Sequence, residues 1–342
     1  MNAPQNRFFA PGTEFARIER MFGPDHFARD GRGLGDDGFV WQPAPGSAWV
    51  AASDASVEGV HYRLDWVTPA RALRKAFLSN LSDLNAMGAR TRFALFNLGA
   101  HCDWDTAVYE SLGATLLDLE TRHGFRISGG DTTTVIGSGF FSITVLGTVE
   151  GRPLLRSAAQ VGDRLYATGS FGGSAAGLEL LRAGSAAGGA VSQDTFDSLV
   201  NAHLDPAPPL DLGPLLAKLC RSDRPLAAID VSDGLSSELW HLARQSGCAL
   251  HLDFEKIPAH PSLSALSPEA RRAHLLHGGE EYQLLFTGSF TDAELARLRA
   301  IAPVTEIGSV EDGEGVFLRE GGETRPLQSG GFEHGPAKTD AG

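Results

Sequence analysis

The ten residues from Asn80 to Ala89, Asn-Leu-Ser-Asp-Leu-Asn-Ala-Met-Gly-Ala, combine a core pattern with a candidate chemical group. They close a segment that opens at Thr68-Pro69, and a threonine followed by proline is typical of a helix start. We therefore expect a helix that runs to about Met87 and stops at Gly88. Its core stripe is Leu73, Phe77, Leu81 and Leu84. Asp83 lies off this stripe, on the face that carries Asn80.

Strands are predicted on both sides of this helix. The run Trp49–Ala55 is small and apolar, and it places Ser53-Asp54 at its C-terminal end. Further along the chain we expect a strand at Phe93–Gly99, a helix at Thr106–His123 and a strand at Phe140–Val149. The turn at Glu150–Pro153 marks the expected boundary between residues 1–150 and residues 151–342.

The second half contains a further series of predicted elements. A strand at Arg164–Thr168 leads into a glycine-rich stretch, Gly169–Ser174, and then a helix through Leu181; a helix entered through glycines can offer backbone N–H groups to an anion. The other predicted elements are a helix near Leu215, a strand at Ala227–Asp230, a helix at Ser236–Ser246, and strands near Leu250–Phe254, Tyr282–Thr287 and Val304–Val310. We expect a short helix at Thr13–Phe22 and a frayed tail from Gly335 to Gly342.

The charge balance excludes some partners. The chain of 342 residues has 42 Asp and Glu against 29 Lys and Arg, a net charge of −13. This acidity disfavours nonspecific binding to nucleic acid or to anionic membranes. Three widely spaced cysteines, Cys102, Cys220 and Cys248, form no disulfide framework, and no apolar run is long enough to span a membrane. We therefore expect a cytoplasmic protein.

Aspartates next to glycine or small hydroxyl residues are the most informative feature. Each one alone is well explained as an Asx-turn or a helix N-cap. Together they suggest a shared site, because Mg²⁺ binds through a few carboxylates and substrate phosphates, and small neighbours let a polyphosphate approach. The set is Asp36, Asp37, Asp54, Asp83, Asp131, Asp230 and Asp233.

Several standard nucleotide and hydrolase motifs are missing. The stretch at Gly169 lacks the lysine of a P-loop and is not a G-x-G-x-x-G dinucleotide fingerprint. There is no G-x-S-x-G elbow, and His274 with His277 is too small a cluster for zinc. A phosphoryl-transfer protein of this kind would have to hold phosphates with metal and arginine.

The ordered motifs resemble the thiamine-monophosphate kinase family over about Thr13 to His334. In chain order they are Gly35-Asp36-Asp37, Ser53-Asp54, Val57–Tyr62, Asn80–Ala89, Gly129–Thr133, Ile143–Gly147, Arg156-Ser157, Gly162-Asp163, Gly169–Leu178, Asp230–Leu235, Gly278–Tyr282 and Gly331–His334. Each motif is moderately specific alone, whereas their joint order is highly specific.

The resemblance implies a two-domain fold, α/β and α+β, shared with aminoimidazole ribonucleotide synthetase. Residues 1–150 would form an N-terminal metal- and ATP-binding domain whose sheet pairs across a homodimer, and residues 151–342 a C-terminal α+β domain with a short flexible tail. The implied reaction is ATP-dependent phosphorylation of thiamine monophosphate to thiamine diphosphate, with Mg²⁺, and without nucleic acid or membrane partners.

The resemblance also implies roles for individual residues. The positions that match metal ligands are Asp37, Ser53, Asp54, Asp83, Asp131, Asp230 and Asp233. The positions that match nucleotide contacts are Gly130, Asp131, Arg156 and Ser232, and those that match thiamine contacts are His61, Glu280 and Phe332. No acid or base catalyst is expected, because the acceptor phosphate is already largely ionised near neutral pH.

Ordinary structural roles remain open for several of these residues. Arg156 can fork onto phosphate oxygens or lie on the surface after a strand. His61 can be a partly buried structural histidine, Glu280 a solvated turn carboxylate, and Phe332 a packing residue. The chain departs from the family pattern at Ala52, Ala158, Gln160 and Glu281, where threonine, glycine, arginine and aspartate are usual.

Two other functions stay open at this point. One is an ATP-using enzyme of the same fold that acts on a different acceptor, such as a purine-pathway amide. The other is a nonenzymatic metal- or nucleotide-binding subunit that retains the scaffold.

Overall fold

The computed structural model describes Met21, residues 48–184 and residues 191–331. The chain divides into two compact units: one takes the chain up to Leu84 together with Ala89–Glu150, and the other takes Asn85–Gly88 together with the chain from Gly151 onward. Among the described residues, none of the helices combines the length and apolar composition that crossing a membrane requires. The predicted helix at Thr13–Phe22 lies outside the described residues except for Met21, which is helical.

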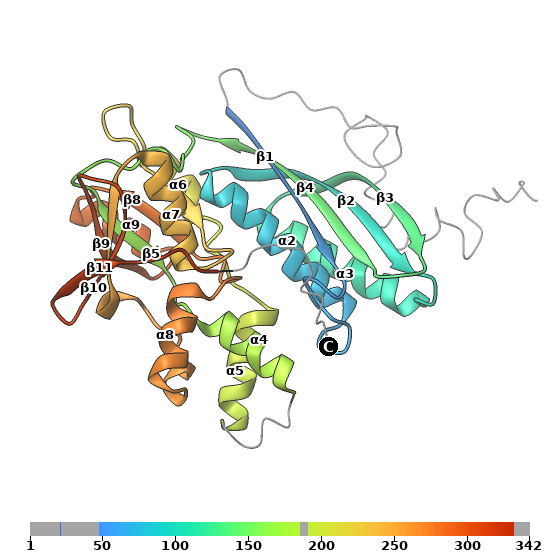
Figure 1. Cartoon of the computed structure of the whole chain (residues 1–342). Helices are drawn as coiled ribbons and strands as arrows, with labels where there is room; N and C mark the ends of the chain where they lie inside the picture. Colours follow the sequence, from blue (N-terminus) through green and yellow to red (C-terminus); the bar gives the residue numbers. More distant parts are fainter. Residues whose placement is uncertain (1–20, 22–47, 185–190, 332–342) are drawn as a thin grey trace, which may run out of the picture. The chain divides into compact units, whose positions relative to one another are not determined.

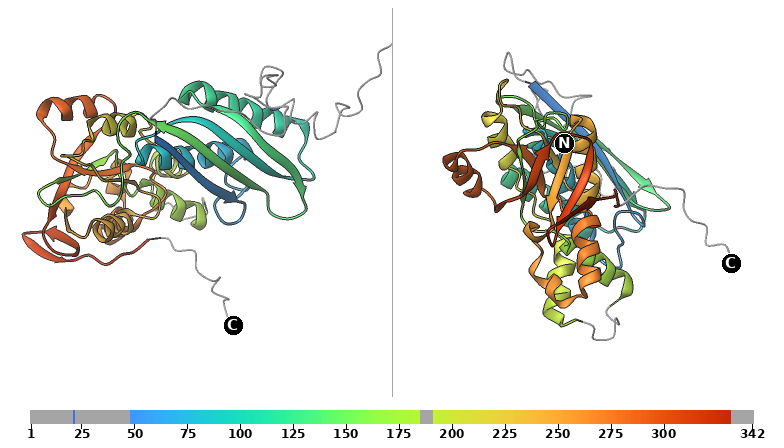
Figure 2. Two further views of the ribbon diagram at one scale, coloured as in Figure 1. Left: turned by 90° about the horizontal axis from the view of Figure 1, so that it is seen from above. Right: turned by 60° about the vertical axis from the view of Figure 1, so that its left-hand side comes forward.

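The first unit is built on a four-stranded sheet. Its strands are β1 (Ala48–Val57), β2 (Arg90–His101), β3 (Arg126–Val135) and β4 (Phe140–Val149). They lie side by side in the order β1-β4-β2-β3, as the left view of Figure 2 shows. Only β2 and β3 pair in parallel, and the other neighbours are antiparallel.

Two helices, α2 (Pro69–Ala86) and α3 (Thr106–His123), supply the core of this unit (Figure 1). The predicted stripe of α2 is confirmed, because its four residues are at most 2% exposed. Phe77 on this stripe packs against Phe96 of β2, with ring centroids 5.8 Å apart. The side chain of Asp105 caps the start of α3, and Gly124 ends that helix in the left-handed conformation at φ 68°.

The alternation along β4 gives the sheet two different faces. Phe141, Ile143 and Val145 are fully buried, whereas Ser142 and Thr144 between them are partly exposed. Side chains alternate between the two faces of a strand, and directly paired residues share a face. One face is therefore apolar and packed by the helices, and the other is more polar and open within this unit.

The second unit is built on a seven-stranded sheet in the order β11-β10-β7-β9-β5-β8-β6. The strands are β5 (Arg164–Thr168), β6 (Ala228–Asp230), β7 (Ala249–Asp253), β8 (Leu284–Gly288), β9 (Val304–Glu311), β10 (Gly315–Glu320) and β11 (Glu323–Pro326). The helices are α4 (Gly173–Ala183), α5 (Gln193–Leu204), α6 (Leu212–Leu219), α7 (Leu235–Ser246), α8 (Pro268–His277) and α9 (Asp292–Arg299). The sheet is mixed, since only β7 and β10 pair in parallel.

Most predicted elements are confirmed, several of them to the residue. The strand β3 was not predicted, nor were α5, α8, α9, β10 and β11. Two local expectations were wrong. Asp131 lies inside β3 and not in a turn, and Ser53-Asp54 lie inside β1, which continues to Val57.

Candidate functional site

The loop between β6 and α7, Val231–Gly234, carries Ser232 and Asp233 and follows Asp230 at the end of β6. Three backbone hydrogen bonds hold it against the segment that precedes β8. The N–H groups of Glu280 and Tyr282 donate to the carbonyls of Ser232 and Val231 at 2.7 and 2.8 Å, and the N–H of Val231 donates to the carbonyl of Gln283 at 2.8 Å. The second unit therefore brings Asp230, Ser232 and Asp233 close to Glu280.

Unusual backbone conformations mark this pair of segments. Glu280 and Tyr282 have φ values of 58° and 52°, and no other described residue except glycine has a positive φ. Such conformations persist only where the surroundings hold them, and they concentrate at functional sites. Gly234 has φ 134°, and a Cβ at this position would meet the His277 carbonyl oxygen at 2.8 Å. The loop thus depends on glycine where it approaches α8.

Glu238, in the first turn of α7, lies beneath this loop and was not singled out from the sequence. Its side chain accepts hydrogen bonds from the N–H groups of Ser232 and Asp233. Burial raises the pKa of Glu238 to about 7, and the neighbouring Asp233 and Asp230 carboxylates add to this effect, while the hydrogen bond from Asp233 opposes it. An acidic residue in a first turn is common, so the sequence offered no special signal.

A second buried group adjoins Glu280. His203 is 3% exposed, and its Nδ1 lies 3.1 Å from Ser174 Oγ and 3.5 Å from Glu280 Oε2. Glu281 Oε1 accepts a hydrogen bond from the N–H of Ser174 at 3.1 Å. The glycine-rich entry to α4 was expected to offer N–H groups to an anion, and at Ser174 the anion is the carboxylate of Glu281 from the chain itself.

Arg156 lies in the segment before β5. Its backbone carbonyl accepts a hydrogen bond from Ser246 Oγ at 2.8 Å. Its side chain is exposed, and within the described part of the chain its guanidinium makes no hydrogen bond or ion pair. Arg156 is thus held by its backbone, and its nucleotide contact stays a prediction.

In the first unit, Asn80 of α2 contacts Asp54 of β1. The side-chain oxygen of Asn80 accepts a hydrogen bond from the backbone N–H of Asp54 at 3.1 Å. Asn80 is 1% exposed and is fixed by a bond from its own Nδ2 to the Ala76 carbonyl. Asp83 follows one turn later on the same side of α2. These two carboxylates therefore lie on the helix side of the sheet.

Ser53 and Asp131 lie on the opposite face. Ser53 pairs with Thr144, and their hydroxyls are 2.8 Å apart, whereas Asp131 pairs with Asn97 of β2. Strands β4 and β2 lie between β1 and β3, so Ser53 and Asp131 are three inter-strand spacings apart. At about 4.8 Å per spacing, the Cα atoms of these two residues are about 14 Å apart or more. One ion with ligand distances of about 2.1 Å cannot bind both side chains.

Gly130 has a structural requirement of its own. It has φ 148°, and a Cβ there would lie 1.8 Å from the Phe96 carbonyl oxygen. A larger residue would therefore disturb the pairing of β2 with β3. Close packing explains this glycine, and its predicted nucleotide contact remains a separate question.

His61 follows β1 and closes a local turn. Its Nδ1 accepts a hydrogen bond from the backbone N–H of Val57 at 3.1 Å, so in the neutral ring Nε2 carries the proton. The next residue, Tyr62, is buried and stacks on Phe141 at 5.4 Å. His61 thus has a structural role, and its thiamine contact stays a prediction. Asp37 and Phe332 lie outside the described residues.

The donor set suits a hard cation, since it consists of carboxylate and hydroxyl oxygens. Within residues 48–184 and 191–331, no three His, Cys, Asp or Glu side chains form a group that could hold a metal. Mg²⁺ usually binds through one or two carboxylates and completes its shell with water and phosphate oxygens. The donors therefore fit Mg²⁺ bound together with a phosphate ligand.

The chain aligns with curated proteins over nearly its whole length. It is 35% identical over 331 residues to the thiamine-monophosphate kinase of Escherichia coli (strain K12), a match that covers 94% of this chain and 98% of that protein. It is 30% identical over 309 residues to the thiamine-monophosphate kinase of Bacillus subtilis (strain 168), with 88% and 93% covered. Residues 35–149 match the family model described as AIR synthase related protein, N-terminal domain.

Solved structures agree in fold. The thiamine-monophosphate kinase of Stenotrophomonas maltophilia K279a superposes with a TM-score of 0.76 at 31% identity, covering 89% of this chain and 94% of that one. AaThiL complexed with AMPPCP and TMP gives 0.73 at 28% identity, with 86% and 89% covered. The hydrogenase maturation protein HypE in complex with ATP, at 19% identity and a TM-score of 0.72 with 95% and 97% covered, shares the fold. With its aspartate motifs on an AIR synthase-like mixed α/β fold, the chain belongs to the thiamine-monophosphate kinase family.

Proposed function

We propose that this chain transfers the terminal phosphoryl group of ATP to thiamine monophosphate and so forms thiamine diphosphate. The relationship to the Escherichia coli enzyme, 35% identity across 94% of the chain, carries this proposal. The solved complex of AaThiL with AMPPCP and TMP supports it, since that relative binds an ATP analogue and TMP together. Family membership alone makes the chain a kinase.

The local geometry of the second unit is consistent with both substrates lying near each other. Ser232 is a proposed nucleotide contact and Glu280 a proposed thiamine contact, and a backbone hydrogen bond of 2.7 Å joins them. The half-buried carboxylate of Glu280 offers a negative partner for the thiazolium ring or an acceptor for the aminopyrimidine. His61 and Phe332 complete the proposed thiamine contacts, and Gly130, Asp131 and Arg156 the nucleotide contacts.

In this proposal Mg²⁺ is held by Asp37, Ser53, Asp54, Asp83, Asp131, Asp230 and Asp233 in more than one group. Bound Mg²⁺ would offset the repulsion between two phosphorylated substrates and stabilise charge during in-line transfer. The chain's own residues then orient the acceptor phosphate, which needs no strong base. No covalent intermediate is part of the proposal.

The dimer implied by the family is also a proposal. Along the open face of the first sheet, Trp49 is 39% exposed, and Phe93, Leu95 and Leu146 are partly exposed. Such a face suits the same surface of a second copy. Light scattering on the purified chain should give twice the chain mass, and a monomer at micromolar concentration would contradict the dimer.

The decisive test of function supplies the purified protein with ATP, Mg²⁺ and one acceptor at a time. We expect thiamine diphosphate from thiamine monophosphate, and no phosphorylation of unphosphorylated thiamine. Saturating thiamine monophosphate should also raise the melting temperature in the presence of an ATP analogue, because ligands that bind only the folded state stabilise it. Folded, metal-supplied protein that makes no thiamine diphosphate would exclude the proposed reaction.

A further inference from the structure

Glu238 connects helix α7 to the loop that carries Ser232 and Asp233. Glu238 is 1% exposed. A single oxygen, Oε1, accepts three hydrogen bonds: from the Asp233 N–H at 2.9 Å, from the Ser232 N–H at 3.2 Å and from Ser232 Oγ at 3.2 Å. The family resemblance gave Glu238 no role.

This arrangement fixes the direction of the Ser232 hydroxyl. Backbone N–H groups can only donate, so Oε1 must act as an acceptor, and a proton on the Glu238 carboxyl would lie on Oε2. The hydroxyl hydrogen of Ser232 therefore points to Glu238 in either protonation state. The lone pairs of Ser232 Oγ are left for other partners.

The other carboxylate oxygen of Glu238, Oε2, also indicates a role at the loop. Within the described part of the chain, Oε2 is buried and has no hydrogen-bond partner. A buried oxygen without a partner costs free energy, and native proteins keep few of them. In this protein the unpartnered oxygen belongs to the residue whose other oxygen, Oε1, holds the loop of the candidate site.

We infer that Glu238 is a positioning residue, which holds the Ser232–Asp233 loop so that Ser232 Oγ serves as a hydrogen-bond acceptor or cation ligand. Ser232 would then not donate its hydroxyl hydrogen to a phosphate oxygen. The inference rests on the proposed function for the identity of the ligands. The hydrogen bonds of the loop themselves do not depend on it.

The experiment compares Glu238→Ala, Glu238→Gln and a matched control, Glu294→Ala. Glu294 also lies in the first turn of a helix and accepts a backbone N–H, from Thr291 at 2.9 Å, but far along the chain from the loop. Amide hydrogen exchange in peptides that span residues 231–234 should speed up in Glu238→Ala and stay near wild type in Glu238→Gln and Glu294→Ala. Thermal unfolding verifies that each variant is folded.

Kinetics and binding provide the second readout. We expect Glu238→Ala to lower kcat/KM about 10- to 100-fold, as is typical for residues that orient ligand-binding groups, and Glu238→Gln to recover most of this loss. Titration calorimetry with Mg²⁺ and AMPPCP should show weaker binding for Glu238→Ala than for Glu294→Ala. Adding Ser232→Ala to Glu238→Ala should cost less than the two single losses combined, because one residue acts through the other.

Unchanged exchange at residues 231–234 in Glu238→Ala would overturn the inference, as would additive losses in the double variant. An activity loss no larger than that of Glu294→Ala would also overturn it. If the wild type makes no thiamine diphosphate, the proposed function fails, and hydrogen exchange still decides whether Glu238 positions the loop.

Discussion

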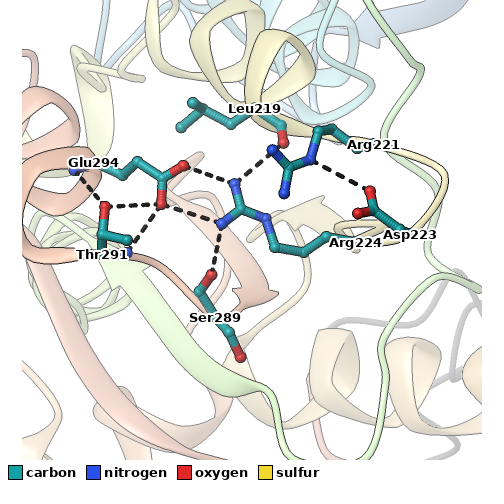
Figure 3. A network of polar contacts seen from close by, with 7 residues as sticks. All are labelled: Leu219, Arg221, Asp223, Arg224, Ser289, Thr291 and Glu294. Atoms are coloured by element: carbon teal, nitrogen blue, oxygen red, sulfur yellow. Dashed lines mark hydrogen bonds and ion pairs between the residues drawn. The ribbon is translucent and has the colours of Figure 1, made fainter.

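Glu238 and Glu294 occupy similar places in the second unit but opposite electrostatic surroundings. Each lies in the first turn of a helix and accepts backbone N–H groups. Glu294 forms a two-pronged pair with Arg224, with N–O distances of 2.7 and 3.1 Å (Figure 3). Glu238 has no cationic partner among the described residues and lies near Asp230 and Asp233. The fold therefore shifts the pKa values of these two carboxylates in opposite directions.

The pKa values express this difference. The hydrogen bonds from Arg224 and Thr291 lower the pKa of Glu294 to about 2, whereas burial raises that of Glu238 to about 7. Arg224 is further held by the carbonyl of Ser289 at 3.1 Å, so the pair ties the segment after α6 to α9 (Figure 3). The Arg224–Glu294 pair thus joins two segments of the second unit, whereas Glu238 lies next to further carboxylates of the candidate site.

Neutralising one carboxylate in the candidate-site loop and one in the Arg224–Glu294 pair should give the largest difference in activity. We expect Asp233→Asn to lower kcat/KM by about 100-fold or more, the effect of losing one group that stabilises the transition state, while the protein stays folded. Glu294→Gln should instead lower the melting temperature and leave kcat/KM within about twofold. Steady-state kinetics and calorimetric melting of both variants test this, and near-normal turnover of Asp233→Asn would refute the metal assignment of Asp233.

Arg224→Ala should cause the next largest effect, on stability alone. Both side chains of the pair are about four-fifths buried, with exposed fractions of 20% and 19%. Loss of the two charged hydrogen bonds should lower the free energy of unfolding by about 1–3 kcal/mol. Urea unfolding measures this, with Arg221→Ala as the control, because Arg221 is 61% exposed in its pair with Asp223. Equal losses in both variants would contradict a special role for Arg224.

The smallest expected effect is a change of the free energy of unfolding at acidic pH. The folded pKa of Glu294 lies below its ordinary value of 4.5, so its stabilisation is complete above about pH 4.5 and is lost as the pH falls toward about 2. The difference in unfolding free energy between wild type and Glu294→Gln should therefore shrink when urea unfolding is repeated from pH 7 down to pH 3. A difference that grows on acidification would contradict the direction of the pKa change.

Regular elements were predictable where one pattern repeats over several turns. The stripe of α2 specifies which side chains of that helix face the core, and it is observed; the run Phe140–Val149, rich in β-branched and aromatic residues, forms β4 as predicted. The strand β3 was missed, because Gly129-Gly130-Asp131 carries local signals of a turn, and pairing with β2 overrides them. Short elements such as α9 were missed because a few residues carry little periodic signal.

The sequence by itself determined the kinase family, the order of the aspartate motifs and the acidic composition, because each depends only on which residues are present and in what order. The tertiary structure decided which of the candidate site residues lie in contact. It separated Ser53 from Asp54 by the pleat of one strand, joined Ser232 to Glu280 through a backbone bond and placed Glu238 beneath the loop. Pairing register and burial arise between distant segments, so no local spacing could contain them.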